Sequence, residues 1–506
     1  MSGPEPVYLD YAATTPVDPA VAEAISRCLT ESDCIGNASS VTHLFGRRAA
    51  ERIERARAEV AALIGAAAAE IVFTSGATES NNLAILGAAR ANAYRGRHIV
   101  SSRIEHKAVL DPLRQLEKEG FAVTLLSPDR SGRIDPEAVA AAIRPQTVLA
   151  SIMLVNNEIG VIGDVAAIGA LCRERGVLLH CDAAQAAGKI PLDVRASPLD
   201  FVSITAHKLY GPKGVGALYV RAGARAHLQP ILYGGGQERG LRPGTLPTHQ
   251  IAAFGVACEL ASRELTAEHA RLSGLRERLW QGLVTLGGVH RNGEGLQCVP
   301  GILNVSFEGV EGESLVAGLP EVAVATGSAC NSASAEPSYV LRALGRDTQL
   351  AQSSLRLSFG RFSRPEHIDT AVAAIGREVG RLRELSPASE PPGKTGESGY
   401  APGAGAGGQI VGEAGGPGQE VWVRFRLEVA DGVVKGALFK AYGCPHTLAV
   451  AAWVAERLRG RDRAALAPGR PAEWADALAV PVEKLGRLLV IEDALANCAR
   501  HWPEQG

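Results

Sequence analysis

The chain of 506 residues lacks several features that mark particular protein classes. Lys and Arg total 52 against 54 Asp and Glu, so no basic excess could hold a polyanion and we expect no nucleic-acid partner. No run of about 18 apolar residues is present, which argues against a membrane-spanning helix and a membrane partner. The opening MSGPEPVYLD has neither a basic segment nor an apolar core. It therefore shows no export signal, and we expect a cytoplasmic location.

The nine cysteines include no CxxC pair. A chain without an export signal is expected to fold in a reducing compartment, so most of these cysteines should be small buried hydrophobic residues. Any exception must be argued from its neighbours.

Residues 1–385 alternate short apolar runs with amphipathic stretches, the pattern of a mostly parallel sheet covered by helices. The expected strands are Ile71–Thr74, His98–Ser101, Val123–Leu126, Thr147–Val155, Val177–Cys181 and Phe201–Thr205. The expected helices between them are Arg47–Gly65, Asn81–Tyr94, Ala108–Glu119, Pro136–Ile143 and Val165–Arg175.

Composition changes sharply after Leu385. Residues 386–418 are dense in Gly, Pro and Ser, which predicts a flexible linker. Beyond it, Glu420–Val429 and Val433–Lys440 alternate like paired strands around an Asp-Gly turn. Residues 447–459 and 482–500 have helical periodicity, so residues 419–506 are expected to form a small α+β domain.

A lysine in an unusual setting gives the first indication of chemistry. Lys208 follows the strand Phe201–Thr205, and Asp182 ends an earlier strand. An aspartate there can pair with a pyridinium nitrogen while the lysine forms a Schiff base with the same ring. The residues GATES at 76–80 follow a strand and precede a helix, an arrangement that offers backbone N–H groups to a phosphate. A surface lysine alone would mean little, but the three features together are a strong signal.

These residues resemble the fold-type I pyridoxal-phosphate enzymes, and specifically the cysteine desulfurases of the NifS/IscS type. The resemblance runs from Tyr8 to about Leu385. Its motifs are LDYAATTP at 9–16, GNASSVTHLFG at 36–46, TSGATESNN at 74–82, EHKAVL at 105–110, NNEIG at 156–160, DAAQ at 182–185, SITAHKLYGPKG at 203–214, RPGTLP at 242–247, ATGSACNSASAEPSYVLRALG at 325–345 and SSLRLSFGRF at 353–362. It implies a large domain at about 16–260 with a seven-stranded sheet, and a small α/β domain built from the N-terminal segment and about 261–385.

The resemblance also implies a role for each matching residue. Lys208 would hold pyridoxal 5′-phosphate covalently and move the substrate proton, and His106 would lie against the ring and assist. The implied cofactor contacts are Asp182 at the ring nitrogen, Gln185 at the ring oxygen, Asn157 at the ring oxygen or the substrate, and Ala77, Thr78, Thr205, His207 and Thr245 at the phosphate. Thr245 would reach the phosphate from a partner subunit, which implies a homodimer. Arg356 would clamp the carboxylate of L-cysteine, with Asn37 in support; a helix-capping role for Asn37 is an equal alternative.

Cys330 decides the reaction. It lies among small, polar residues in GSACNSAS at 327–334, whereas a core cysteine usually has branched apolar neighbours. Such a setting suits a mobile, exposed thiolate. The expected reaction is attack of Cys330 on the substrate sulfur, which leaves a persulfide and releases L-alanine. The sulfur would serve iron–sulfur cluster assembly, other cofactors or tRNA thiolation. Cys330 is then also a candidate ligand for a transient [2Fe-2S] cluster shared with a scaffold partner.

The tail resembles, more faintly, the U-type iron–sulfur scaffold proteins, through FKAYGC at 439–444 and VIEDA at 490–494. Those scaffolds use three cysteines, and here only Cys444 remains. The other ligand positions fall on Gln419, Val421 and Gly486-Arg487. One thiolate cannot hold a two-iron cluster that needs four ligands. Three interpretations stay open: a sulfur acceptor at Cys444, a docking module for a separate scaffold, or a vestige.

Two other classes of function are weighed against the desulfurase. An aminotransferase or selenocysteine lyase would share the cofactor site, but an aminotransferase would not need Cys330. A sulfur carrier or scaffold with an inert enzyme half would not need Lys208, Asp182, His106 and Arg356 together.

Overall fold

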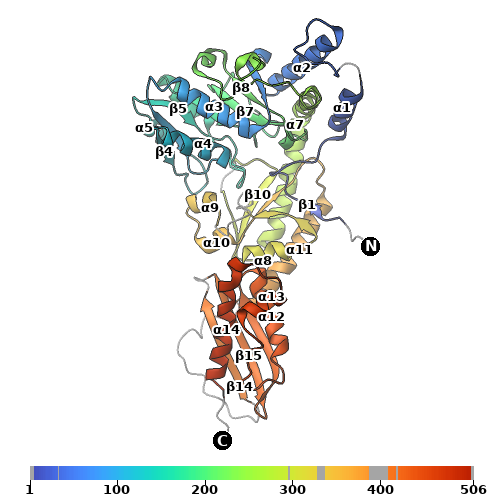
Figure 1. Cartoon of the computed structure of the whole chain (residues 1–506), viewed down its shortest axis with the longest axis vertical. Helices are drawn as coiled ribbons and strands as arrows, with labels where there is room; N and C mark the ends of the chain where they lie inside the picture. Colours follow the sequence, from blue (N-terminus) through green and yellow to red (C-terminus); the bar gives the residue numbers. More distant parts are fainter. Residues whose placement is uncertain are drawn as a thin grey trace.

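The computed structural model describes residues 5–31, 34–293, 297–326, 337–386, 408–416 and 420–502. Three parts follow one another along the long axis of the molecule: a large α/β part, a smaller sheet with its helices, and the tail (Figure 1). Within these residues, no helix is both long enough and apolar enough to cross a bilayer.

A seven-stranded sheet organises the large part. Its order is β2-β8-β7-β6-β5-β3-β4, and only β8 runs antiparallel to its neighbours. The strands are β2 (Ile71–Thr74), β3 (His98–Ser102), β4 (Ala122–Leu126), β5 (Thr147–Ser151), β6 (Leu178–Asp182), β7 (Phe201–Thr205) and β8 (Gly216–Val220). All except β4 are buried along their whole length, as expected for a sheet covered on both faces. The predicted mostly parallel, seven-stranded sheet is confirmed.

Helices flank this sheet (Figure 1). They are α1 (Pro19–Thr30), α2 (Leu44–Leu63), α3 (Ala77–Ala91), α4 (Lys107–Lys118), α5 (Pro136–Ala142), α6 (Val165–Glu174) and the long α7 (Thr248–Val284). The short helix η2 (Ala206–Lys208) directly follows β7. Buried side chains from the sheet and helices form two clusters, so the sheet has a core on each side.

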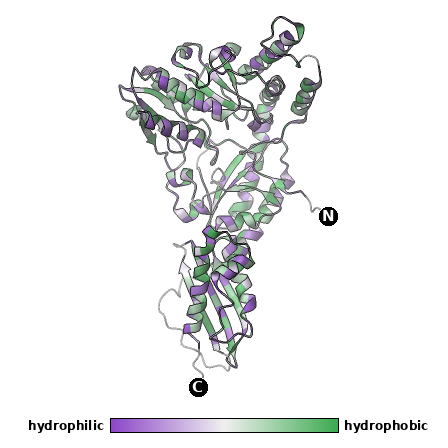
Figure 2. Ribbon diagram, in the orientation of Figure 1, coloured by the Kyte–Doolittle hydropathy of each residue, from purple (hydrophilic) through white to green (hydrophobic). Residues whose placement is uncertain are grey.

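The smaller part contains a four-stranded sheet in the order β12-β13-β10-β9 and a separate parallel pair, β1 with β11. The strands are β1 (Val7–Tyr8), β9 (Val289–Arg291), β10 (Ile302–Phe307), β11 (Val322–Ala323), β12 (Ala325–Thr326) and β13 (Ser354–Ser358), and the helices are α8 (Gly312–Ala317), α9 (Tyr339–Ala343), α10 (Thr348–Gln352) and α11 (Pro365–Leu385). β10 is buried throughout and its ribbon is mainly hydrophobic in Figure 2. The N-terminal strand β1 thus joins this part, as the resemblance implies.

The tail is a three-stranded antiparallel sheet packed against helices. It comprises β14 (Gly408–Gly416), β15 (Val421–Ala430), β16 (Val433–Tyr442), α12 (Pro445–Arg457), α13 (Pro471–Ala477) and α14 (Leu485–Arg500). The predicted linker, residues 386–418, is wrong for residues 408–416, because they form the edge strand β14. Glycines suit this strand where α14 crosses it: a side chain at Gly412 would collide with the backbone of Ala494 and Cys498.

The tail packs on the smaller part. The Ser314 hydroxyl of α8 donates to the Gly443 carbonyl over 2.7 Å, and Lys484 pairs with Glu313 at 2.8 Å. Leu448 of α12 packs against the core of the smaller part. These contacts bring the start of α12, where Cys444 is the N-cap residue, against the enzyme.

The expectation of buried cysteines is confirmed for five free thiols, at Cys172, Cys181, Cys258, Cys444 and Cys498. Cys28 and Cys34 instead form a disulfide. That bond joins the last turn of α1 to the loop that follows it, and neither cysteine's neighbours in the sequence predict it.

Candidate functional site

Several of the predicted site residues follow strands that end at one edge of the large sheet. β2, β3, β5, β6 and β7 all run in the same direction, so their carboxyl ends meet there. Asp182 ends β6, and the neighbouring strand β7 leads through Thr205 into η2 and Lys208. Ligands bind at this edge in open α/β sheets. The lysine and aspartate therefore lie at the ends of adjacent strands, as a shared ring would require.

The Asp182 carboxylate is held in place from two sides. The Asn81 side-chain amide of α3 donates to Oδ2 over 2.7 Å, and the Ala184 N–H donates to Oδ1 over 2.9 Å. Asp182 is only 5 % exposed. These two hydrogen bonds fix the orientation of the carboxylate, which an aspartate that pairs with a pyridinium nitrogen needs. Sequence reasoning did not select Asn81, although it lies within the TSGATESNN motif.

His106 is neutral and its orientation is fixed. As the N-cap of α4, its Nδ1 accepts the Ala108 N–H over 3.1 Å, so the proton of the neutral ring lies on Nε2. Burial and the positive charge of Lys208 lower the pKa of His106. His106 and Lys208 therefore lie close enough for the charge of one to act on the other.

The start of α3 forms a cradle for an anion. Gly76, the N-cap residue, has φ of +148°, a conformation that side-chain-bearing residues rarely adopt. A side chain there would lie 3.7 Å from Thr205 Oγ1, so the Thr205 hydroxyl faces this turn. Thr205 Oγ1 is buried and has no hydrogen-bonding partner. Ala77 and Thr78 occupy the first turn of this helix, where backbone N–H groups are unpaired.

His207 follows Thr205 by two residues, in η2, and contacts the N-terminal segment. Its Nδ1 is 3.2 Å from Thr14 Oγ1, and its carbonyl accepts the Thr15 N–H over 2.9 Å. Burial, followed by the charges of Lys208 and Lys213, lowers the pKa of His207 to about 4. His207 is therefore a neutral donor or acceptor at neutral pH.

Arg356 and Asn157 meet opposite the sheet edge. Arg356 Nη1 donates to the Asn157 carbonyl over 3.1 Å, and Nη2 pairs with Asp10 at 2.8 Å. Arg356 Nε and Asn157 Oδ1 are buried without a hydrogen-bonding partner. Asp10 was not selected from the sequence, although it belongs to the LDYAATTP motif.

Two predicted residues are exposed in the single chain. Thr245 lies on the loop before α7. Asn37 lies on the loop before α2, where its Oδ1 accepts the Ser39 N–H over 2.9 Å. The N-cap of α2 is His43, so the alternative that Asn37 caps this helix is wrong. Cys330 lies outside the described residues, between Thr326 and Pro337.

The site fits pyridoxal phosphate. Buried polar atoms without partners are costly, and this site holds several of them: Thr205 Oγ1, Asn157 Oδ1, Arg356 Nε and Asn81 Oδ1. The same site also contains the start of α3, which suits a phosphate. It contains the buried Asp182 carboxylate, which suits a pyridinium, and Lys208, which can form a Schiff base. The donor set therefore matches the chemistry of this cofactor.

Comparison with known proteins agrees with this geometry. Residues 7–370 match the family model described as aminotransferase class-V. Cysteine desulfurase IscS of Pectobacterium atrosepticum is 55% identical over 382 residues, which cover 76% of this chain and 95% of that protein. The corresponding protein of Aeromonas hydrophila is 56% identical over the same shares.

Solved structures show the same fold. A NifS-like protein superposes with a TM-score of 0.69 at 35% identity, covering 74% of this chain and 100% of its own. The structure of SspA in complex with cysteine superposes with a TM-score of 0.63 at 38% identity, covering 71% and 99%. The chain belongs to the class-V aminotransferase family and, within it, to the pyridoxal-phosphate-dependent cysteine desulfurases.

Proposed function

We propose that the carboxyl-edge site holds pyridoxal phosphate through the residues assembled there. Lys208 binds it covalently, Asp182 pairs with the ring nitrogen, and Gln185 donates to the ring oxygen. Thr205, His207 and the N–H groups of Ala77 and Thr78 bind the phosphate. The bound cofactor supplies an electron sink for the substrate. The observation that carries this assignment is the buried, unpartnered Thr205 hydroxyl facing the start of α3.

The test compares cofactor retention in Thr205→Val and Lys208→Ala. Thr205→Val should lower affinity for pyridoxal phosphate by about tenfold, since one hydrogen bond to a charged group contributes ~1.5 kcal/mol or more. Lys208→Ala should abolish the covalent attachment that borohydride reduction traps in the wild-type protein. Unchanged affinity in Thr205→Val would contradict the phosphate assignment.

The residues around Arg356 support the roles in substrate binding and sulfur removal. Arg356, held by Asp10, offers its remaining N–H to the carboxylate of L-cysteine, with Asn37 in support. Asn157, whose carbonyl accepts from Arg356, contacts the ring oxygen or the substrate. Lys208 and neutral His106 move the substrate proton. The substrate C–S bond breaks as the sulfur bonds to the Cys330 thiolate, and the carbon skeleton takes up a proton and leaves as alanine. Cys330→Ser should abolish sulfide release while leaving cofactor absorbance intact.

For the tail we propose a degenerate U-type scaffold fold that accepts sulfur at Cys444. In the described residues, no group of three or more His, Cys, Asp and Glu side chains is placed to hold a metal ion. Cys444 is fully buried, and its Sγ lies 3.5 Å from the Thr447 hydroxyl. A transient [2Fe-2S] cluster shared by Cys330 and a separate scaffold remains part of the same proposal for the enzyme half.

The position of Cys444 favours acceptance over docking. Helix α8 contacts both β12, which leads toward Cys330, and α12, which begins after Cys444. Cys330 is the fourth residue after Thr326, so its Cα lies at most ~14 Å from that of Thr326. The end of the tail that bears Cys444 is already covered by the enzyme, so it is not free to dock onto a separate scaffold.

Arg487 completes this sulfur site. Burial opposes its charge, but the Cys444 sulfur and the Glu311 and Glu313 carboxylates outweigh burial and raise the pKa of Arg487. A cation thus stands at one of the positions where the scaffold family has metal ligands. In the transfer, the Cys444 thiolate attacks the outer sulfur on Cys330, the bond to Cys330 breaks, and Cys330 leaves as a thiolate.

Mass-spectrometric mapping of persulfides after a single turnover tests the transfer. The persulfide, trapped with a chemical label, should be found on Cys330 first and then on Cys444. Cys444→Ser should leave label on Cys330, whereas the control Cys498→Ala, in the core of the tail, should not change the pattern. Label confined to Cys330 at all times in the wild-type chain would refute the transfer.

We further propose a homodimer in which Thr245 of one subunit completes the other's phosphate site. The exposure of Thr245 in the single chain supports this arrangement. Mixing and refolding Thr245→Val with Lys208→Ala should restore part of the activity, because one site of the mixed dimer is then intact. A monomeric mass by light scattering would contradict it.

A further inference from the structure

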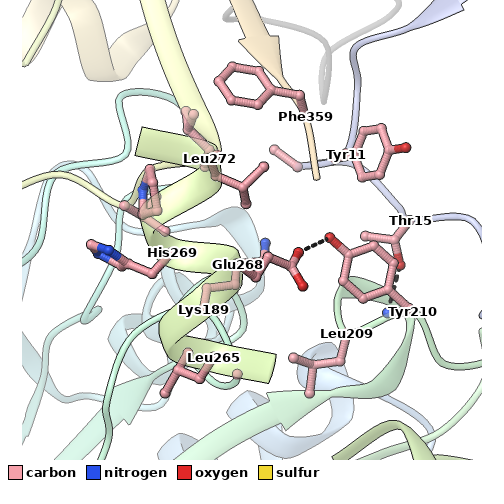
Figure 3. Close-up of a pocket in the computed structure, with 16 residues that line it drawn as sticks. Tyr11, Thr15, Lys189, Leu209, Tyr210, Leu265, Glu268, His269, Leu272 and Phe359 are labelled. Atoms are coloured by element: carbon pink, nitrogen blue, oxygen red, sulfur yellow. Dashed lines mark hydrogen bonds between the residues drawn. The ribbon is translucent and has the colours of Figure 1, made fainter. Parts of the chain in front are cut away.

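Lys189 lies near the site, and none of the roles above uses it. It follows β6, seven residues after Asp182, and is half-buried at a pocket that it shares with Tyr210 and Glu268 (Figure 3). Glu268 accepts a hydrogen bond from the Tyr210 hydroxyl over 2.8 Å, as the dashed line in Figure 3 shows.

Lys189 makes one well-formed hydrogen bond, to a cofactor-binding residue. Its Nζ donates to Gln185 Oε1 over 2.7 Å, and Gln185 Nε2 donates to the Ala12 carbonyl over 2.8 Å. An ammonium can only donate and a carbonyl can only accept, so the two partners fix which end of the amide is oxygen. The second hydrogen on Nε2 is therefore presented as a donor and cannot be exchanged for an acceptor by a flip.

We propose that Lys189 is a positioning residue, whose ammonium locks and polarises the Gln185 amide as a donor to the cofactor ring oxygen and adds positive charge beside Lys208. The inference rests on the proposed contact between Gln185 and that oxygen. A donor polarised by a cation stabilises negative charge on the oxygen. The same cation disfavours a proton on the Lys208 nitrogen once it is joined to the cofactor.

The charges around Lys189 agree with this role. Lys208 and Arg356 face it as cations and Glu268 as an anion, from η2, β13 and α7. Burial, then Lys208, lower the pKa of Lys189 to about 7. Lys189 in turn contributes to the lowered pKa of His207. Its charge is therefore sensed across the cofactor site, and it is fully present below neutral pH.

The test is a pH titration of the visible absorbance of the holoenzyme in Lys189→Met, Lys189→Gln and Lys189→Arg, with Lys118→Met on the exposed face of α4 as the control. The midpoint is the pH at which half of the absorbance change has occurred. Loss of the Lys189 charge should shift this midpoint upward by about half to one pH unit in the Met and Gln variants. The Arg variant and the control should titrate like wild type. A wild-type midpoint in a fully loaded Met or Gln variant, or an equal shift in the Arg variant, would overturn the proposal.

A double-mutant cycle with Gln185→Leu separates action through Gln185 from a direct effect of charge. Without the amide, Lys189→Met should shift the midpoint by less than half as much as it does with the amide present. Fully additive shifts would refute the positioning role. A different result would show that the proposed cofactor assignment is wrong. In that case the Lys208→Ala variant would keep the visible absorbance band and its pH titration.

Discussion

The Arg57 guanidinium and the Glu238 carboxylate form a bidentate pair inside the protein, with hydrogen bonds of 2.7 and 2.8 Å. Glu238 also accepts the Phe73 N–H of β2 over 2.7 Å. Both side chains are almost fully buried. The pair thus joins α2, β2 and the segment before α7. β2 is the strand that leads to Gly76 and the start of α3.

Replacing Glu238 with Gln should destabilise the protein by about 3 kcal/mol, because it leaves the Arg57 charge buried without its partner. Chemical denaturation followed by circular dichroism measures this change. Glu54→Gln is the matched control: Glu54 also pairs with Arg57, but its side chain is 59% exposed, and its loss should cost less than about 1 kcal/mol. Equal effects of the two substitutions would contradict the buried-pair assignment.

Asn81→Leu should reduce kcat for alanine formation by about tenfold, since the Asp182 carboxylate would lose a hydrogen-bond donor that holds it in place. The change should also shift the visible absorbance of the bound cofactor, which reports the protonation of its ring nitrogen. Normal kcat and an unchanged spectrum would show that the Ala184 N–H alone suffices to hold Asp182.

Glu105, the residue before His106, should make stability fall as pH rises. It is fully buried: its Oε1 accepts from the Ser102 hydroxyl and the Met153 N–H, and its Oε2 has no partner. Burial raises the pKa of Glu105 from 4.5 to about 8. The neutral form is therefore favoured in the folded protein, and this contribution is complete below pH 4.5 and is lost as pH rises toward about 8.

Glu105→Gln mimics the protonated side chain, so its stability should depend less on pH. Over this range the wild-type protein should lose on the order of 2–4 kcal/mol more than the variant, since one pKa unit corresponds to about 1.4 kcal/mol. Denaturant titrations at a series of pH values measure both. Parallel pH profiles would mean that Glu105 does not titrate as described.

The docking of the tail should survive cleavage of the chain. A protease site placed within residues 387–407 and then cut should leave the tail bound to the enzyme during size-exclusion chromatography. Leu448→Asp combined with Lys484→Glu should release it, because these changes remove an apolar contact and the ion pair with Glu313. Arg500→Glu, exposed at the end of α14, is the control and should leave the tail attached.

None of the residues assigned above to the proposed cofactor site comes from the described parts of the tail, 408–416 and 420–502. Deletion of residues 387–506 should therefore leave alanine formation within about twofold of wild type when a small thiol accepts the sulfur. A large loss would show that the tail supports the chemistry itself.

The sequence predicted the large sheet well because its strands are buried runs with clear boundaries. Ile71–Thr74 and Phe201–Thr205 were predicted to the residue. The Asp431–Gly432 turn was also predicted, and both residues have the positive φ that such a turn needs. The expected strand Thr147–Val155 is too long, since β5 ends at Ser151, before the polar residues 156–157.

The misses have physical causes. The edge strand β14 is rich in glycine and gave no strong strand signal; it owes its conformation to nine residue pairings with β15 and to α14. The antiparallel strand β8 was also missed. Asn81 and Asp10 act by holding Asp182 and Arg356, and such contacts depend on distant parts of the chain. The motifs contained both residues, but spacing alone gave no reason to choose them.

Because the tail and the enzyme share one polypeptide and are packed together, donor and acceptor are always present in equal numbers. The proposed passage of sulfur from Cys330 to Cys444 within the chain would then be a unimolecular event. Its rate should stay constant on dilution, in contrast to transfer to a separate acceptor protein.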